Sequence, residues 1–219
     1  MERDVVGFFI SGHPLDKYKF EMQHISTKGG LALLENIDAM NGKRFQLGGM
    51  ISNAEHRISQ AGSPWGQFTL EDYDGSYEFR LFRDDYLAYK NFMNDEWMVL
   101  VSGVVSKRPS WGNNPVDRGC EFKIKKIEML SDVKDKRLEK VVIDLNLNAF
   151  DRKWVDNLES AISASKGKVG MVINVFDGKN KLEMPSRNTH VGVSNEFLEK
   201  LESVCIPGVA NYKFELKKG

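Results

Sequence analysis

Apolar and polar residues alternate on both sides of the pair Asp74-Gly75. Before the pair, the apolar residues Phe68 and Leu70 are separated by one polar residue. After it, apolar residues stand at every second position of residues 77–81. Successive side chains of a strand point to opposite faces, so the pattern is typical of two strands with one buried face. Asp-Gly is favoured at the two central positions of a tight hairpin turn. The segment therefore predicts an antiparallel hairpin that needs further strands to cover its apolar face.

Residues 43–130 continue the β-rich pattern around this hairpin. An alternating stretch precedes the hairpin, and a helical pattern over 84–93 follows it. Then come a strand that bends at Gly103, a loop rich in Pro, Gly and Asn over 107–119, and a fifth strand. Three strands, a helix and two further strands is the order of a five-stranded OB-fold barrel, a fold that often binds nucleic acid.

Two further regions flank this barrel, and together they make the fold class mainly β plus α/β. Residues 1–42 predict a lead-in of short helices that is too small to bury its own core and should pack on the barrel. Residues 131–219 predict a two-layer β-α-β-β-α-β domain, with Asp151 and Ser194 capping its helices. Within it, the charged stretch 131–139 predicts a linker or an exposed turn. The side chains expected in the core of this domain are Trp154, Phe176, Phe197 and Leu201.

Composition narrows the possible functions. No run approaches the roughly 18 apolar residues of a membrane span, and Cys120 and Cys205 make no disulfide framework, so we expect a cytoplasmic protein without a membrane partner. Lys+Arg and Asp+Glu are both 31, which argues against a protein that holds nucleic acid by bulk charge. Any such affinity must come from a few placed cations and from stacking on aromatic rings, and should be modest.

The acidic residues and histidines do not indicate catalysis. Asp72 and Asp74 fit a hairpin turn, and Asp84 stands where a helix cap is expected. The four histidines are scattered, and no Cys/His pair has the spacing of metal ligands. We therefore expect no catalytic residue, no metal and no cofactor in this chain.

Two motifs suggest a family. Glu2–Asp16 reads ERDVVGFFISGHPLD, and Gly66–Phe82 reads GQFTLEDYDGSYEFRLF. In this order and spacing they resemble the C-terminal part of the alpha subunit of bacterial DNA polymerase III, a replicative polymerase. The last domain resembles that family in its order of elements and in the helix start Ser194–Glu196.

The resemblance implies an OB domain beside the single-stranded template, followed by a domain that contacts the tau subunit of the clamp loader. It also implies that the nucleotidyl-transfer centre, with its Mg²⁺, and the clamp-binding peptide lie upstream. We therefore expect a monomeric, non-catalytic fragment of a DNA-directed DNA polymerase that binds single-stranded DNA, tau and other replisome proteins.

An OB-fold binds its ligand on the outer face of strands 2 and 3 and on the loops that join strands 1–2 and 4–5. Because side chains of a strand alternate between its two faces, Gln67 and Arg80 are expected to face outward. Phe82 either faces outward as well or is covered by the helix. The first loop is expected to supply His56, Arg57, Ser59 and Trp65. The predicted nucleic-acid-binding residues are Arg57, Trp65, Gln67, Arg80, Lys107, Arg108, Trp111, Lys123 and Lys125.

Other interpretations stay open at this point. Trp65 and Trp111 could instead close the ends of the barrel, with the cations merely solvated. The hairpin motif is also similar to that of anticodon-binding OB domains, which would make tRNA the ligand. A purely architectural or protein-interaction module is the third possibility, and the zero net charge favours it.

Overall fold

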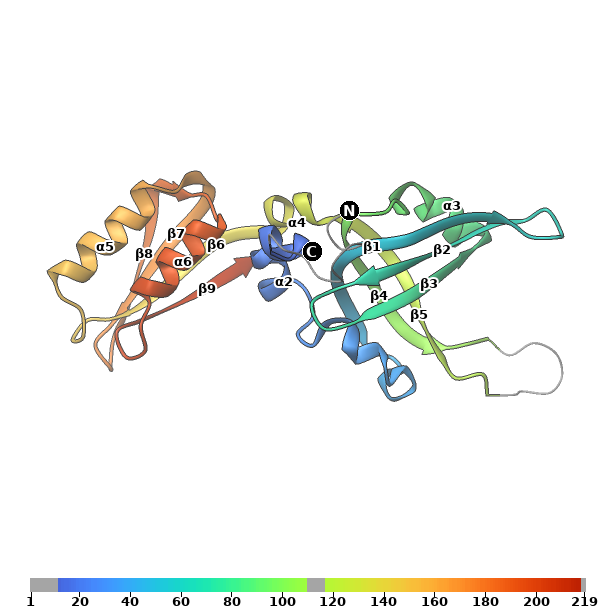
Figure 1. Ribbon diagram of the computed structural model, residues 1–219. Coiled ribbons are helices and arrows are strands. Elements are labelled where there is room, and N and C mark those ends of the chain that lie inside the picture. The colour runs from blue at the N-terminus through green and yellow to red at the C-terminus, as the bar shows by residue number, and fades with distance from the viewer. Residues whose placement is uncertain (1–11, 110–116, 218–219) are drawn as a thin grey trace. The chain divides into compact units, whose positions relative to one another are not determined.

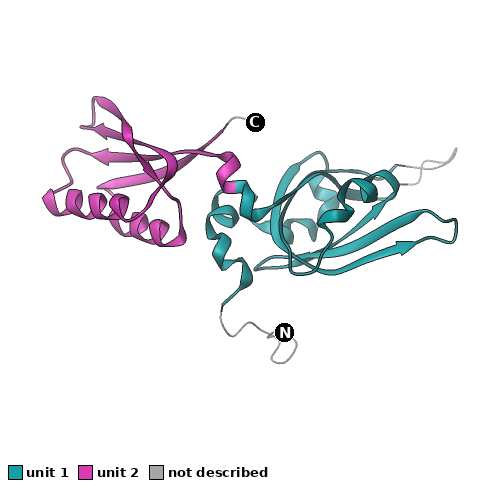
Figure 2. Cartoon of the chain, turned by 90° about the horizontal axis from the view of Figure 1, so that it is seen from above, with its two compact units in different colours: residues 1–133 teal, residues 134–219 magenta. Residues whose placement is uncertain are grey.

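The computed structural model describes residues 12–109 and 117–217. The chain divides into two compact units, Met1–Val133 and Lys134–Gly219 (Figure 2). Each unit contains one β-sheet. Trp111 and most of the first family-like motif, residues 2–11, lie outside the described residues.

Short helices open the described part of the first unit. Leu31 and Leu34 are 1% and 3% exposed and join the core of the sheet that follows. The expectation that the lead-in packs on the barrel is therefore confirmed. The helices are η1 (Pro14–Tyr18), α2 (Lys19–His24), η2 (Gly30–Leu34) and η3 (Ile37–Met40).

Five antiparallel strands follow in the spatial order β3-β2-β1-β4-β5, with a helical connection between β3 and β4 (Figure 1). This arrangement agrees with the predicted five-stranded OB-fold. The elements are β1 (Arg44–Ile58), β2 (Pro64–Glu71), β3 (Ser76–Phe82), α3 (Arg83–Tyr89), η4 (Lys90–Phe92), β4 (Met98–Lys107) and β5 (Cys120–Met129).

The alternation around the hairpin is confirmed by burial. Phe68 and Leu70 on β2 are fully buried, and Phe79 and Leu81 on β3 are nearly so. Burying a side chain of this size stabilises the fold by roughly 1.5–3 kcal/mol. The residues between them therefore form the outer face of the sheet.

The β2–β3 turn differs from the predicted two-residue turn. It spans Asp72–Gly75, because the Asp72 N–H donates to the Gly75 carbonyl at 3.0 Å. Neither Asp74 nor Gly75 has a positive φ. The Asp72 carboxylate accepts from the N–H groups of Asp74 and Gly75, both at 2.9 Å, which stabilises this longer turn. The extra turn residues shift the pairing so that Trp65 lies opposite Phe82.

The edges of β3 and β5 leave an open seam in the barrel. Over the described residues, β3 pairs with β2 and β5 pairs with β4, and no ladder joins β3 to β5. The predicted bend at Gly103 is present as a register shift between β4 and β5. A Cβ at Gly103 would lie 2.4 Å from the Lys123 carbonyl oxygen, so the close approach of the strands requires glycine there.

The second unit has the predicted β-α-β-β-α-β order. Its sheet order is β8-β7-β6-β9, in which only the β6–β7 pair is parallel among the described ladders. Both main helices cover one face of this sheet (Figure 1). The elements are β6 (Leu138–Asn146), α5 (Arg152–Ser163), β7 (Lys166–Phe176), β8 (Lys181–Val191), α6 (Asn195–Val204) and β9 (Ala210–Leu216).

Side-chain caps fix where the two helices begin. The Asp151 carboxylate accepts from the Trp154 N–H at 2.8 Å, and the Ser194 hydroxyl accepts from the Phe197 N–H at 3.2 Å. Each cap satisfies an N–H group that has no partner within its helix. Both predicted caps are confirmed.

Two expectations about residues 131–219 are corrected by the structure. The stretch 131–139 includes the boundary between the two units, as a linker would, but it is not an exposed turn: most of it belongs to helix α4 (Leu130–Arg137), in which Leu130 and Val133 are fully buried. Phe176, expected in the core, is 37% exposed because it ends β7 beside the turn to β8. Phe197 and Leu201 are buried as expected. Trp154 is half-buried, and its indole N–H donates to the Val204 carbonyl at 2.9 Å.

Candidate nucleic-acid interface

The outer face of β1, β2 and β3 brings several of the predicted residues together. In the ladders, Arg57 lies opposite Trp65, and Trp65 lies opposite Phe82. The next row across the same three strands is Glu55, Gln67 and Arg80. Residues directly opposite in an antiparallel pair share a face and contact one another.

The row of Arg57, Trp65 and Phe82 is stacked. The ring centroids of Trp65 and Phe82 are 5.7 Å apart, with only 20° between the ring planes. The guanidinium carbon of Arg57 lies 5.6 Å from the centroid of the Trp65 ring, within cation–π range. Trp65 therefore lies on the sheet surface, on strand β2, and not in the predicted loop. Helix α3 does not cover Phe82, which is 56% exposed.

Acidic neighbours engage the polar residues of this face. Arg57 forms an ion pair with Glu55, and the Gln67 amide donates to the same carboxylate at 3.3 Å. Arg80 forms an ion pair with Glu78 at 2.7 Å. These side chains are largely exposed, so each pair contributes little to stability and can exchange for another anion.

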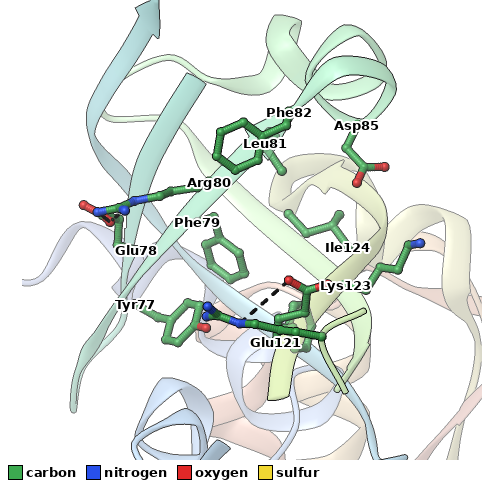
Figure 3. A pocket seen from close by; sticks show the side chains of 12 residues that line it. Tyr77, Glu78, Phe79, Arg80, Leu81, Phe82, Asp85, Glu121, Lys123 and Ile124 are labelled. Carbon is green, nitrogen blue, oxygen red and sulfur yellow. Dashed lines mark hydrogen bonds and ion pairs between the residues drawn. The ribbon is translucent and has the colours of Figure 1, made fainter. Parts of the chain in front are cut away.

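The open seam between β3 and β5 forms a pocket of about 500 Å³ (Figure 3). Phe79, Leu81 and Ile124 supply apolar side chains from the two strands, and Lys123 extends beside them (Figure 3). Arg108 also lines the pocket, 4.0 Å from the Glu121 carboxylate. Three cations and three carboxylates line it among the described residues, so its net charge is close to zero.

The remaining predicted residues are more scattered. Lys107, at the end of β4, forms an ion pair with Asp117 at 3.3 Å. An amide hydrogen bond from Gly119, aided by Lys107, lowers the pKa of Asp117. Lys125 is exposed on β5 at the register shift. Trp111 lies outside the described residues, so its expected role has no structural context.

His56 and Ser59, expected beside Arg57, do not join the outer face. His56 lies on β1 with its ring nitrogens 3.0 Å from the Tyr86 hydroxyl and 3.3 Å from the Met93 carbonyl, so it packs toward α3. The Ser59 hydroxyl accepts from the Ser63 N–H at 3.1 Å within the β1–β2 turn.

The acidic residues near the hairpin have structural partners. The Asp72 carboxylate accepts a third N–H, that of Leu31, at 2.7 Å and thereby joins the turn to the lead-in. Asp84 was expected to cap helix α3, but Phe82 holds the N-cap position and Asp84 lies in the first turn. Within the described ranges, no group of three or more His, Cys, Asp or Glu is placed to hold a metal ion.

The two motifs that suggested a family meet in space. The rings of His13 and Tyr73 are 4.7 Å apart, and the Tyr73 hydroxyl donates to Asp16 at 3.1 Å. Burial and this hydrogen bond raise the pKa of Tyr73 to about 12. His13 also caps η1, so the Gly-His-Pro turn positions the residues that hold the hairpin tip.

Comparison with known proteins supports the same family. Residues 141–205 match the family model for the DNA polymerase III alpha subunit, C-terminal domain. The chain resembles the C-terminal region of bacterial DNA polymerase III alpha subunits. The alpha subunit of Saccharopolyspora erythraea is 24% identical over 202 residues, which is 92% of this chain.

Other alpha subunits match shorter stretches. That of Escherichia coli K12 is 24% identical over 74% of the chain, and that of Mycobacterium tuberculosis H37Rv is 30% identical over 49%. The chain spans 16%, 13% and 9% of the length of these three relatives. The polymerase III resemblance expected from the sequence is confirmed.

None of the helices in the described ranges is long and apolar enough to span a membrane.

Proposed function

We propose that this chain is a template-handling and docking part of a replicative DNA polymerase in the bacterial cytoplasm, and that its first unit binds single-stranded DNA. The observation that carries the proposal is the stacked row of Arg57, Trp65 and Phe82 on the outer face of an OB-type sheet. Single-strand binding needs flat rings for bases and cations for phosphates, and Arg80, Arg108 and Lys123 line one pocket together with Phe82.

The balanced charges make this binding weak and dependent on salt. Each cation of the face has a carboxylate nearby or lines a pocket with as many carboxylates as cations. Stacking of one base contributes on the order of 1–3 kcal/mol, so a few stacked bases are enough for measurable binding at low salt. Such binding suits a strand that must slide through the polymerase.

Competition between nucleic acids tests the class of ligand. A fluorescent oligo-dT of about 20 nucleotides is titrated at low salt, followed by unlabelled single-stranded DNA, duplex DNA and tRNA as competitors. We expect unlabelled single-stranded DNA to compete best. Preferential competition by tRNA would support the anticodon-type function instead, and absence of binding would support the architectural one.

A second proposed function is docking of a replisome protein, the clamp-loader tau subunit, by the second unit. The observation that favours it is an apolar groove of about 680 Å³ between α5 and the β7–β8 hairpin. Leu147, Leu182 and Met184 line this groove and are 50%, 62% and 43% exposed. Contiguous exposed apolar surface of this kind is typical of protein interaction sites.

A further inference from the structure

The stacked row on the outer face ends at Phe82. Arg57, Trp65 and Phe82 lie opposite one another on three neighbouring strands, so each planar group contacts the next. Trp65 is in the middle of the row and is half-buried, whereas Phe82 lies on the edge strand β3 and is 56% exposed. The accessible aromatic ring at the end of the row is therefore that of Phe82.

Phe82 also connects the outer face with the seam pocket. It lines the pocket between β3 and β5, together with Arg80, which belongs to the outer face, and Lys123, which belongs to β5. Figure 3 shows Phe82 and Leu81 at one end of this pocket and Tyr77 at the other. A base stacked on Phe82 would thus bring its phosphate to the edge of β3, on the side where Arg80 and Lys123 lie.

Arg57 is not placed as a residue that binds a DNA phosphate would be. Its guanidinium is paired with the Glu55 carboxylate and lies over the Trp65 ring. Arg80 is also ion-paired, but Arg57 differs from it in contacting an aromatic ring of the row and in not lining the seam pocket. The contact of Arg57 with the indole instead restricts the position of the ring that supports Phe82.

We propose that Phe82 is the residue on which a base of the single strand stacks, and that Arg57 is a positioning residue that holds Trp65 against it. This inference rests on the proposed binding of single-stranded DNA. The proposal gives a role to Phe82, whose orientation the sequence left undecided. It also makes Arg57 a positioning residue, whereas the sequence predicted that Arg57 contacts the DNA as a cation.

Phe82 is tested by affinity and by its salt dependence. We expect Phe82→Ala to weaken oligo-dT binding on the order of 5- to 150-fold, while the slope of log K against log salt stays unchanged, because no charge is removed. Phe82→Trp should restore the affinity. Leu87→Ala, which removes a 53% exposed apolar side chain from α3, is the matched control and should leave binding unchanged.

Arg57 is tested by coupling to Trp65. We expect Arg57→Met to weaken binding without changing the salt slope, and to have less than about a twofold effect when Trp65 is already alanine. Lys123→Met is the contrasting variant, and it should reduce the slope by about 0.7, the value for one phosphate contact on a single strand.

The outcomes separate this inference from the proposed function. If the unmodified chain binds oligo-dT and Phe82→Ala binds equally well, the stacking role of Phe82 is wrong and the proposed function stands. If Arg57→Met reduces the salt slope as Lys123→Met does, Arg57 contacts phosphate directly. If the unmodified chain does not bind at all, the proposed function is wrong, and this inference with it.

Discussion

Asp72 shows how much of this fold depends on one side chain. Its carboxylate accepts the N–H groups of Leu31, Asp74 and Gly75, and so joins the lead-in to the β2–β3 turn. We expect Asp72→Ala to lower the free energy of unfolding by about 1–3 kcal/mol, because N–H groups that are partly buried lose their acceptor. Urea unfolding followed by circular dichroism measures this change.

Asp74→Ala is the matched control for this prediction. Asp74 is exposed in the same turn, and its N–H donates to Asp72 whatever its own side chain is. Its replacement should change the free energy of unfolding by less than about 0.5 kcal/mol. Equal losses in the two variants would mean that the charge of the turn, and not the three hydrogen bonds, stabilises it.

At the scale of elements, the groove beside α5 carries the docking proposal. We expect Leu182→Ser combined with Met184→Ser to weaken binding of the tau subunit by at least about tenfold, because both side chains are exposed in the groove. Surface plasmon resonance with immobilised tau measures the affinity.

The control for the groove is an apolar residue elsewhere on the same unit. Ile206 is 48% exposed and does not line the groove, so Ile206→Ser should leave tau binding unchanged. The urea midpoints of both variants should match that of the unmodified chain. Loss of tau binding in Ile206→Ser alone would place the docking surface outside the groove.

The order of elements could be predicted because period-2 and helical patterns report which residues face a core. The pairing register could not be predicted. A two-residue turn at Asp74-Gly75 would place Trp65 opposite Asp84, whereas the observed turn starts at Asp72 and places it opposite Phe82. The stacked row depends on that shift, and the hydrogen bonds of Asp72 stabilise the turn that sets it. Helix α4 was missed because its few apolar residues, Leu130 and Val133, stand among charges.

For the molecule as a whole, we expect binding of DNA without catalysis of nucleotide transfer. The purified chain should not extend a primed template with deoxynucleotides and Mg²⁺, because the acidic residues near the hairpin hold backbone N–H groups or lie on a helix. A primer-extension gel measures this. Nucleotide incorporation activity that co-purifies with the chain would contradict this expectation.

Removal of divalent cations should leave DNA binding intact. The proposed contacts are aromatic rings, arginines and lysines, and none of them requires a metal ion. We expect the affinity for oligo-dT to be the same in EDTA as in Mg²⁺ at equal ionic strength, as measured by fluorescence anisotropy. A loss of binding in EDTA that Mg²⁺ restores would indicate a metal-dependent site.

An amide chemical-shift titration with oligo-dT is the decisive measurement for the proposed DNA-binding face, because it reports the binding surface residue by residue. We expect the shifts to gather on the outer face and the seam of the first unit and to weaken as salt is added. The segments expected to respond are 55–58, 64–68, 78–82 and 121–125. Shifts confined to residues 134–217, or no shifts at low salt, would contradict the binding of single-stranded DNA by the first unit.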